Sequence, residues 1–110
     1  MAVSSEEVKE VFDKMKSQFN PERASGVNAV IQVSLTGDNE SHYWLKLMDG
    51  SLEMSEGEAE SANMTLIATA ADFVAIVEGD SNAMQAFMSG KLKVKGDMGL
   101  AMKLQPIFGL

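Results

Sequence analysis

The stretch "GKLKVKGDMGLAMKL", residues 90–104, decides the fold because its two halves follow different periods. In the first half, three lysines alternate with Leu92 and Val94, which is the two-residue period of a strand with one charged and one apolar face. The second half follows Gly96, and Asp97 is a favourable N-cap for a helix. This stretch therefore predicts a strand that leads directly into the last helix of the chain.

The predicted last helix is apolar around most of its circumference. Its apolar side chains are Met98, Leu100, Ala101, Met102, Leu104, Ile107 and Phe108, interrupted by only Asp97, Gly99, Lys103 and Gln105. A helix of this kind has to be covered on more than one side. Its pattern leaves two interpretations open: the helix lines a lipid pocket, or it lies in an ordinary core.

Upstream of this stretch, the same two periods and their start and stop signals mark the other elements. Ser4 and Glu7 have the spacing of a capping box before an amphipathic helix, which ends before Pro21. Thr69 is a suitable N-cap for a second helix, which Gly79 ends. The predicted strands are 27–35, 42–48, 51–55, 64–68 and 91–95, with a turn or short loop at 36–41 and a short helix at 82–89.

The resulting order is one helix, four strands, two helices, a strand and a last helix. The first three strands follow one another directly, and Asp49-Gly50 is a strong hairpin signal between the second and third. This order predicts an α+β fold, in which helices cover a five-stranded, largely antiparallel sheet. A length of 110 residues favours a single domain spanning residues 1–110.

Charge is unevenly distributed along the chain. The net charge is −7, which argues against general affinity for nucleic acid, since that affinity depends on lysine and arginine. Residues 90–110 nevertheless carry four lysines and one acid, a balance of +3, whereas the rest of the chain carries −10. The basic end can therefore face a negative surface.

Three of these lysines, Lys91, Lys93 and Lys95, have two interpretations. On an edge strand they discourage aggregation between sheets. Alternatively they contact anionic membrane or the phosphates of an acyl-CoA. A similar choice applies to Met84, Met88, Met98 and Met102, which fill gaps in a core or form an adaptable binding surface.

Several kinds of chemistry are not expected from this sequence. It contains no cysteine, and its single histidine, His42, has no nucleophile motif to serve, so we predict no enzyme activity, no cofactor and no metal. The acidic stretch 56–60 lacks the ligand spacing of an EF-hand and is interpreted as a solvated crossing loop. Neither a signal peptide nor a membrane span is recognisable, which favours a cytoplasmic protein.

The segment "AFMSGKLKVKGDMGLAMKLQ", residues 86–105, closely resembles the C-terminal signature of the sterol carrier protein 2 family. The resemblance extends more weakly through the strand that contains Trp44, through "MTLIATAADFVAIVEG" and through the first helix. It implies an α+β fold with a hydrophobic tunnel between sheet and helices. Such a tunnel holds a sterol, a fatty acid or a fatty acyl-CoA without chemistry.

The resemblance also implies which residues contact the lipid. It places Phe87, Leu92, Met98, Leu100, Met102, Leu104 and Gln105 on or near the tunnel, with Phe73, Ile76 and Val77 on the opposite helix. Met84, Met88 and Phe108 complete the predicted set. Many eukaryotic members end in a peroxisomal Ser/Ala-Lys-Leu tripeptide, whereas this sequence ends in Phe108-Gly109-Leu110, so import by that signal is not expected.

We therefore predict a lipid-binding and lipid-transfer module, either a monomer or a weak homodimer. The alternative is an accessory or dimerisation domain of the same fold, whose apolar end meets a protein partner. A hydrolase is a weak third hypothesis, because the sequence offers no pair of nucleophile and base.

Overall fold

The computed structural model describes residues 4–37 and 40–109 and has the predicted α+β architecture. Its five-stranded sheet has the order β3-β2-β1-β4-β5, in which every neighbouring pair is antiparallel except β1 and β4. The elements are α1 (Ser5–Gln18), β1 (Asn28–Thr36), β2 (Ser41–Met48), β3 (Ser51–Glu56), β4 (Met64–Thr69), α2 (Ala70–Glu78), α3 (Ala83–Met88), β5 (Leu92–Gly96) and α4 (Met98–Phe108). Residues 38 and 39 of the predicted turn lie outside the described residues.

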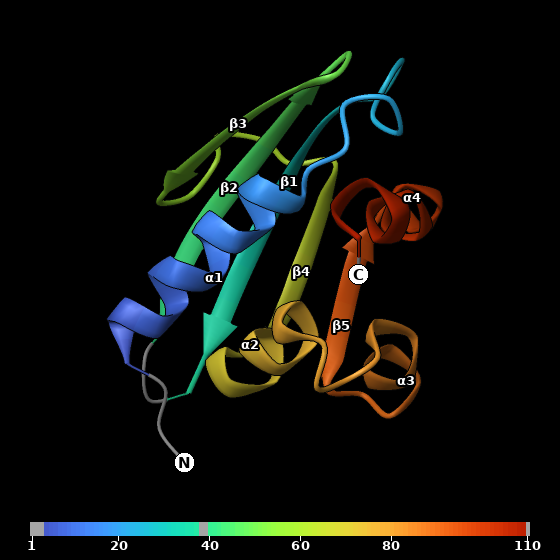
Figure 1. The fold of residues 1–110 in the computed structure, drawn as a ribbon. Helices are drawn as coiled ribbons and strands as arrows, with labels where there is room; N and C mark the ends of the chain where they lie inside the picture. Colours follow the sequence, from blue (N-terminus) through green and yellow to red (C-terminus); the bar gives the residue numbers. More distant parts are fainter. Residues whose placement is uncertain (1–3, 38–39, 110) are drawn as a thin grey trace.

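The helices divide the sheet between them (Figure 1). The first, α1, crosses in front of β1 and β2, while α2, α3 and α4 gather over β4 and β5. The predicted capping box at the start of α1 is confirmed, since Ser4 Oγ accepts from the Glu7 N–H at 3.1 Å. The ring of Phe12 stacks on Tyr43 with centroids 3.8 Å apart, which fixes α1 on the sheet.

Gln32 of β1 is a buried polar side chain. Its Nε2 donates to the carbonyls of Tyr43 and Gly57 at 3.1 and 3.2 Å, and its Oε1 accepts from the Ala59 N–H at 2.7 Å. The connection from β3 to β4 therefore passes over Gln32, and the amide satisfies backbone groups of that connection. Glu58 and Glu60 on the same connection are exposed, as expected of a solvated loop.

The turn from β5 into α4 lies against the residue that precedes β4. Gly96 has φ +97°, and a Cβ built on it would lie 2.5 Å from the carbonyl oxygen of Asn63. The Asp97 N–H donates to the same carbonyl at 3.2 Å, and Asp97 Oδ1 accepts from the Leu100 N–H at 3.1 Å as the predicted N-cap. Only glycine at position 96 allows this close approach, which directs α4 back over the sheet.

Boundaries of the C-terminal elements differ slightly from the prediction. Asn82 and Ser89 cap α3 rather than belonging to it, and β5 begins at Leu92. The shorter α3 has Ala86 as its only buried residue, so few apolar contacts hold this helix in place.

We predict that Gly96→Ala destabilises the protein more than Gly90→Ala. Both glycines have positive φ, which costs another residue about 1–2 kcal/mol, but a Cβ at Gly90 would meet nothing within 4 Å. The backbone contact with Asn63 adds about 1–3 kcal/mol of overpacking to the cost at Gly96. Urea unfolding of both variants measures the difference, and equal losses of free energy would contradict a steric constraint at Gly96.

Candidate functional site

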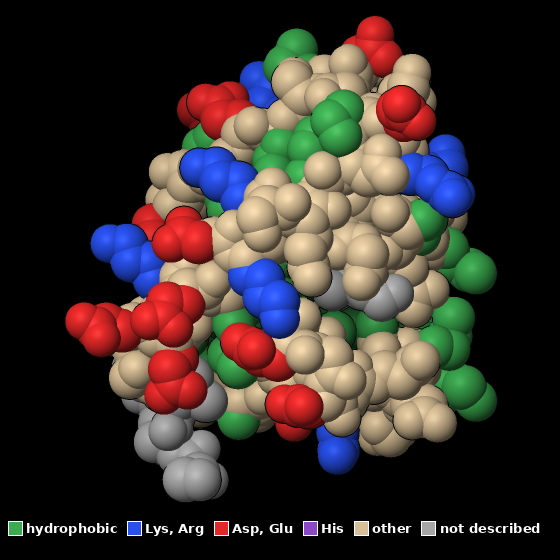
Figure 2. Space-filling model, viewed as in Figure 1, with side chains coloured by type: hydrophobic (Ala, Val, Ile, Leu, Met, Phe, Trp, Pro, Cys, Tyr) green, Lys and Arg blue, Asp and Glu red, His purple; other side chains and the backbone are tan. Residues whose placement is uncertain are grey.

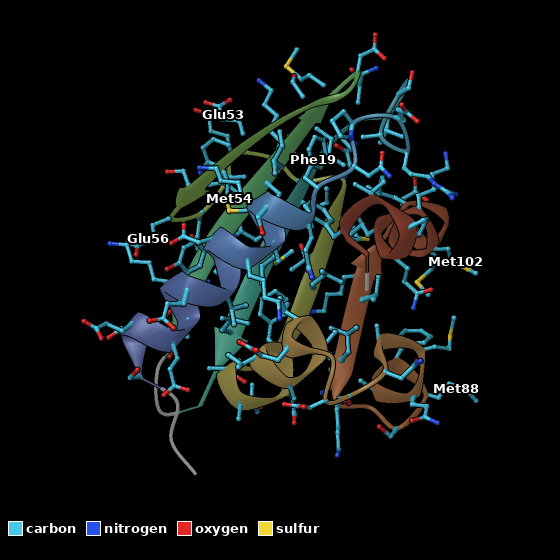
Figure 3. All side chains as sticks on the ribbon, viewed as in Figure 1. Phe19, Glu53, Met54, Glu56, Met88 and Met102 are labelled. Atoms are coloured by element: carbon cyan, nitrogen blue, oxygen red, sulfur yellow. The ribbon has the colours of Figure 1, made fainter. Side chains whose placement is uncertain are left out.

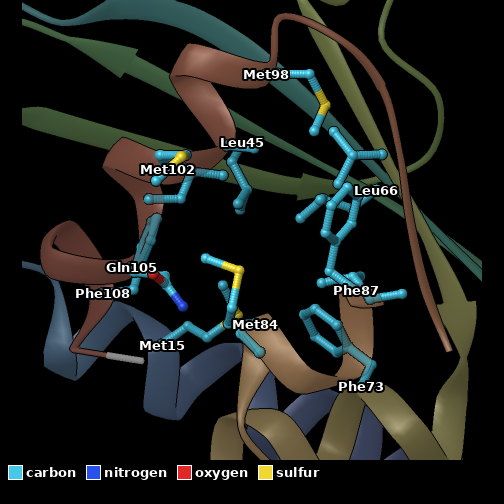
Figure 4. A pocket seen from close by; sticks show the side chains of 15 residues that line it. Met15, Leu45, Leu66, Phe73, Met84, Phe87, Met98, Met102, Gln105 and Phe108 are labelled. Atoms are coloured by element: carbon cyan, nitrogen blue, oxygen red, sulfur yellow. The ribbon is translucent and has the colours of Figure 1, made fainter. Parts of the chain in front are cut away.

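An apolar hollow lies between the sheet and the helices (Figure 4). Its volume is about 120 Å³. The sheet contributes Leu45, Leu66, Leu92 and Val94; α1 and α2 contribute Met15 and Phe73; α3 contributes Ala83, Met84 and Phe87; α4 contributes Met98, Ala101, Met102, Leu104, Gln105 and Phe108. Every helix and three strands therefore supply part of its wall.

The alternation predicted for β5 explains why this wall is apolar. Leu92 and Val94 point into the hollow, while Lys91, Lys93 and Lys95 are exposed, as predicted, on the opposite side of the strand. The strand β5 is an edge of the sheet, which is where lysine is expected.

Among the described residues that line the hollow, Gln105 alone has a polar side chain. Figure 4 shows its amide among the apolar side chains of the wall. It can offer both a donor and an acceptor to a bound molecule. The hollow therefore combines a large apolar surface with a single polar position.

The hollow has a buried floor and an exposed mouth. Met15, Leu45 and Phe108 of the floor belong to the hydrophobic core. Met84, Phe87, Met98 and Met102, here called the rim, line the hollow and are also exposed to solvent. Hydrophobic side chains gather along the side of the molecule formed by α3 and α4 (Figure 2), and Met102 points outward there (Figure 3). The mouth therefore opens between these two helices.

Most of the residues predicted to contact lipid line this hollow. They are Phe73, Met84, Phe87, Leu92, Met98, Met102, Leu104, Gln105 and Phe108. Their convergence from α2, α3, β5 and α4 is a property of the fold, and their contact with a ligand stays a prediction.

Four residues of the predicted set lie elsewhere. Ile76 and Val77 are one helical turn beyond Phe73 on α2, and they line a separate, more polar hollow with Lys14 and Gln18. Leu100 is buried in the core on another side of α4 from Met98 and Met102. Met88 follows Phe87 by one residue, which turns its side chain to solvent (Figure 3).

Six lining residues were missing from the predicted set: Met15, Leu45, Leu66, Ala83, Val94 and Ala101. Val94 could have been included, because it alternates with Leu92 on the same strand face. The sequence identifies Met15, Leu45 and Leu66 only as ordinary apolar positions of a helix or strand. Their neighbouring residues do not show which other helices and strands pack against them.

Charged and titratable groups lie outside the hollow. His42 lies at the start of β2, where its Nε2 is 3.6 Å from Glu40 Oε1 and its Nδ1 is 3.9 Å from Glu58 Oε1. Burial raises the pKa of Tyr43, and the hydrogen bond from its hydroxyl to Glu56 adds to the increase. Among residues 4–37 and 40–109, no group of acidic, histidine or cysteine side chains is arranged to hold a metal ion. None of the helices in these ranges has the length and apolar character of a bilayer crossing.

Comparison with known proteins relates the whole chain to one family. Residues 8–109 match the SCP-2 sterol transfer family. Hydroxysteroid dehydrogenase-like protein 2 of Xenopus tropicalis is 35% identical over 106 residues, which are 96% of this chain and 25% of that protein. The chain thus spans about a quarter of the length of this curated relative.

Solved structures share the same fold. Palmitated SCP2L2 from Aedes aegypti has a TM-score of 0.76 at 22% identity, over 98% of this chain and 96% of that one. A double mutant of the sec-alkyl sulfatase PisA1 from Pseudomonas sp. has a TM-score of 0.80 at 18% identity, over 97% of this chain and 16% of the enzyme. The solved structures show the shared fold, and the family match over residues 8–109 shows that the chain belongs to the SCP-2 sterol transfer family.

Proposed function

We propose that this protein is a non-enzymatic carrier that holds the apolar part of a lipid, such as a fatty acid, an acyl-CoA or a sterol, in the hollow between α3, α4 and the sheet. The observation that supports this proposal most strongly is the wall of the hollow: its described residues are apolar except Gln105, and it reaches solvent at the rim. Family membership and the palmitated Aedes aegypti protein support the proposal.

The side chains of the wall can bind a lipid but offer no group that would catalyse a reaction on it. Nucleophiles and general bases need a titratable or hydroxyl-bearing side chain, and the described lining residues contain none. The amide of Gln105 can meet the polar end of a lipid but is a poor base. A docking site for a protein partner is less favoured, because a concave apolar hollow suits a small ligand better than a protein surface.

Apolar burial gives a rough affinity for an acyl chain. A dozen buried methylenes contribute about 10 kcal/mol in total. Association and ordering of the chain oppose this by about 4 kcal/mol or more. The remainder of about 6 kcal/mol corresponds to a dissociation constant on the order of tens of micromolar.

A whole lipid requires the hollow to widen. Small-molecule sites have volumes of about 300–1,000 Å³, whereas this hollow has about 120 Å³. Among the described helices, the short α3 has the fewest buried residues, with Ala86 alone. Movement of α3 away from α4, together with new rotamers of the flexible methionines, would admit the chain.

Docking on an anionic membrane is the second part of the proposal. The strand β5 contacts both α3 and α4, which carry the rim, and Lys91, Lys93 and Lys95 are exposed along this edge of the sheet, on the side of the strand opposite Leu92 and Val94. Attraction of these lysines to lipid phosphates would bring the mouth close to the bilayer surface.

We predict that Met102→Trp weakens the binding of a fluorescent fatty acid by at least about tenfold, or about 1.4 kcal/mol. The indole would occupy the mouth of the hollow, and because Met102 is exposed, the melting temperature should change little. The matched control is Met88→Trp on α3, which is exposed but does not line the hollow and should bind as the wild type does. Equal binding by both variants, or equal loss, would contradict a site at the rim.

We predict that a triple Lys→Gln variant at positions 91, 93 and 95 binds anionic vesicles on the order of a hundredfold more weakly at low salt, at about 1 kcal/mol per lysine. The difference should shrink at high salt because of screening. A variant with Lys9, Lys16 and Arg23 changed to Gln has the same net charge and is the control, since these side chains are exposed outside β5. If the two variants bind equally, the β5 lysines have no specific role in docking.

A further inference from the structure

Methionines occupy the mouth of the hollow in an unusual concentration. Met84, Met98 and Met102 line the hollow and are 39%, 45% and 61% exposed, respectively. They come from α3, the start of α4 and the next turn of α4, so three thioethers from separate positions meet at one opening. Any molecule that enters the hollow between α3 and α4 has to pass them.

Other methionines of the chain provide references with different surroundings. Met15 lines the floor but is only 2% exposed, and Met64 is 1% exposed. Met48 and Met88 are 52% and 78% exposed but do not line the hollow. Of these methionines, only Met84, Met98 and Met102 both line the hollow and are exposed to solvent.

We propose that Met84, Met98 and Met102 are modification sites, at which oxidation by a peroxide converts the mouth from apolar to polar and reduces lipid binding. The inference rests on the lipid-binding function proposed above and adds a chemical control of that function. Because these three residues are exposed at the surface, a water-soluble oxidant can reach them without unfolding the protein.

The chemistry needs only the thioether and hydrogen peroxide. A lone pair on sulfur attacks one peroxide oxygen, a sulfur–oxygen bond forms and the oxygen–oxygen bond breaks. Sulfur loses two electrons to become a sulfoxide, and the peroxide is reduced to water by transfer of a proton between its two oxygens. No cofactor takes part, and methionine sulfoxide reductases reverse the product.

The position of the sulfoxides determines their effect. A sulfoxide oxygen is a strong hydrogen-bond acceptor, and covering it with an acyl chain removes its water without providing a donor. Gln105 offers the only side-chain donor of the described wall, so it cannot satisfy three sulfoxides. Lipid entry therefore becomes unfavourable, while the floor, with its buried Met15, keeps its packing.

The test compares two methionine-to-leucine variants before and after treatment with hydrogen peroxide. The rim variant has Met84, Met98 and Met102 changed to Leu, and the control variant has Met48 and Met88 changed to Leu. Peptide mass spectrometry locates each added oxygen, titration with NBD-stearate measures binding, and thermal unfolding reports the state of the fold. Methionine and leucine have similar volumes, so both variants should fold. Because the rim variant changes residues that line the hollow, its binding after peroxide treatment is compared with its own affinity before treatment.

We expect peroxide to oxidise the three methionines of the rim and to spare Met15 and Met64. Relative to the same protein before treatment, binding by the wild type and by the control variant should then fall by at least about tenfold, whereas treatment should not change the affinity of the rim variant. Treatment with methionine sulfoxide reductases should restore binding by the wild type. All three proteins should retain their thermal transitions.

Two results would overturn the inference while leaving the carrier function intact: unchanged binding after complete oxidation of the rim, or equal loss of binding by the rim variant. Failure of the rim to oxidise under conditions that oxidise Met48 would also overturn it. Absence of NBD-stearate binding by the untreated wild type would overturn the proposed function as well, so the two failures are distinguishable.

Discussion

The contact between the β5–α4 turn and Asn63 is the constraint on which the rest of the site depends. The carbonyl of Asn63 accepts from the Asp97 N–H, and the missing side chain of Gly96 lets the two backbones approach. Asn63 itself is held by β1, because its Oδ1 accepts from the Val30 N–H at 2.9 Å. Through Asn63, the start of α4 is therefore connected to β1 and to the start of β4, in addition to following β5 directly.

With its start fixed, α4 divides its apolar surface between two environments. Leu100, Leu104, Ile107 and Phe108 are buried, and Met98 and Met102 face the mouth. The described residues leave that second side exposed, since Met98 and Met102 are 45% and 61% exposed. The remaining apolar surface becomes the wall of a hollow, and the small, weakly anchored α3 forms its opposite side. Membership of the SCP-2 sterol transfer family gives this arrangement its functional context.

Caps and alternating patterns in the sequence predicted the helices and strands well, because each of these features acts within a few residues. The caps at Ser4, Thr69 and Asp97 act this way, as does the alternation in β5. The hollow was predicted only in part, because its floor joins residues that are distant in the chain. Nothing near Leu66 shows that it faces α4, and nothing near Gln32 shows that a later connection covers it. Ile76 and Val77 line a different hollow from Phe73 for a related reason, since sharing a helix face with Phe73 does not place them at the same height along the helix.

The central claim is that an acyl chain lies inside this hollow, and isotope-edited NMR tests it most directly. Protein with labelled methyl groups would be mixed with unlabelled palmitate, and contacts between palmitate methylenes and protein methyls would be recorded. The account predicts contacts to Leu66, Leu92 and Val94, which line the hollow, and none to Ile67, which projects from the other face of β4. Contacts confined to Ile67 or to exposed Met48, or no contacts at saturating palmitate, would contradict it.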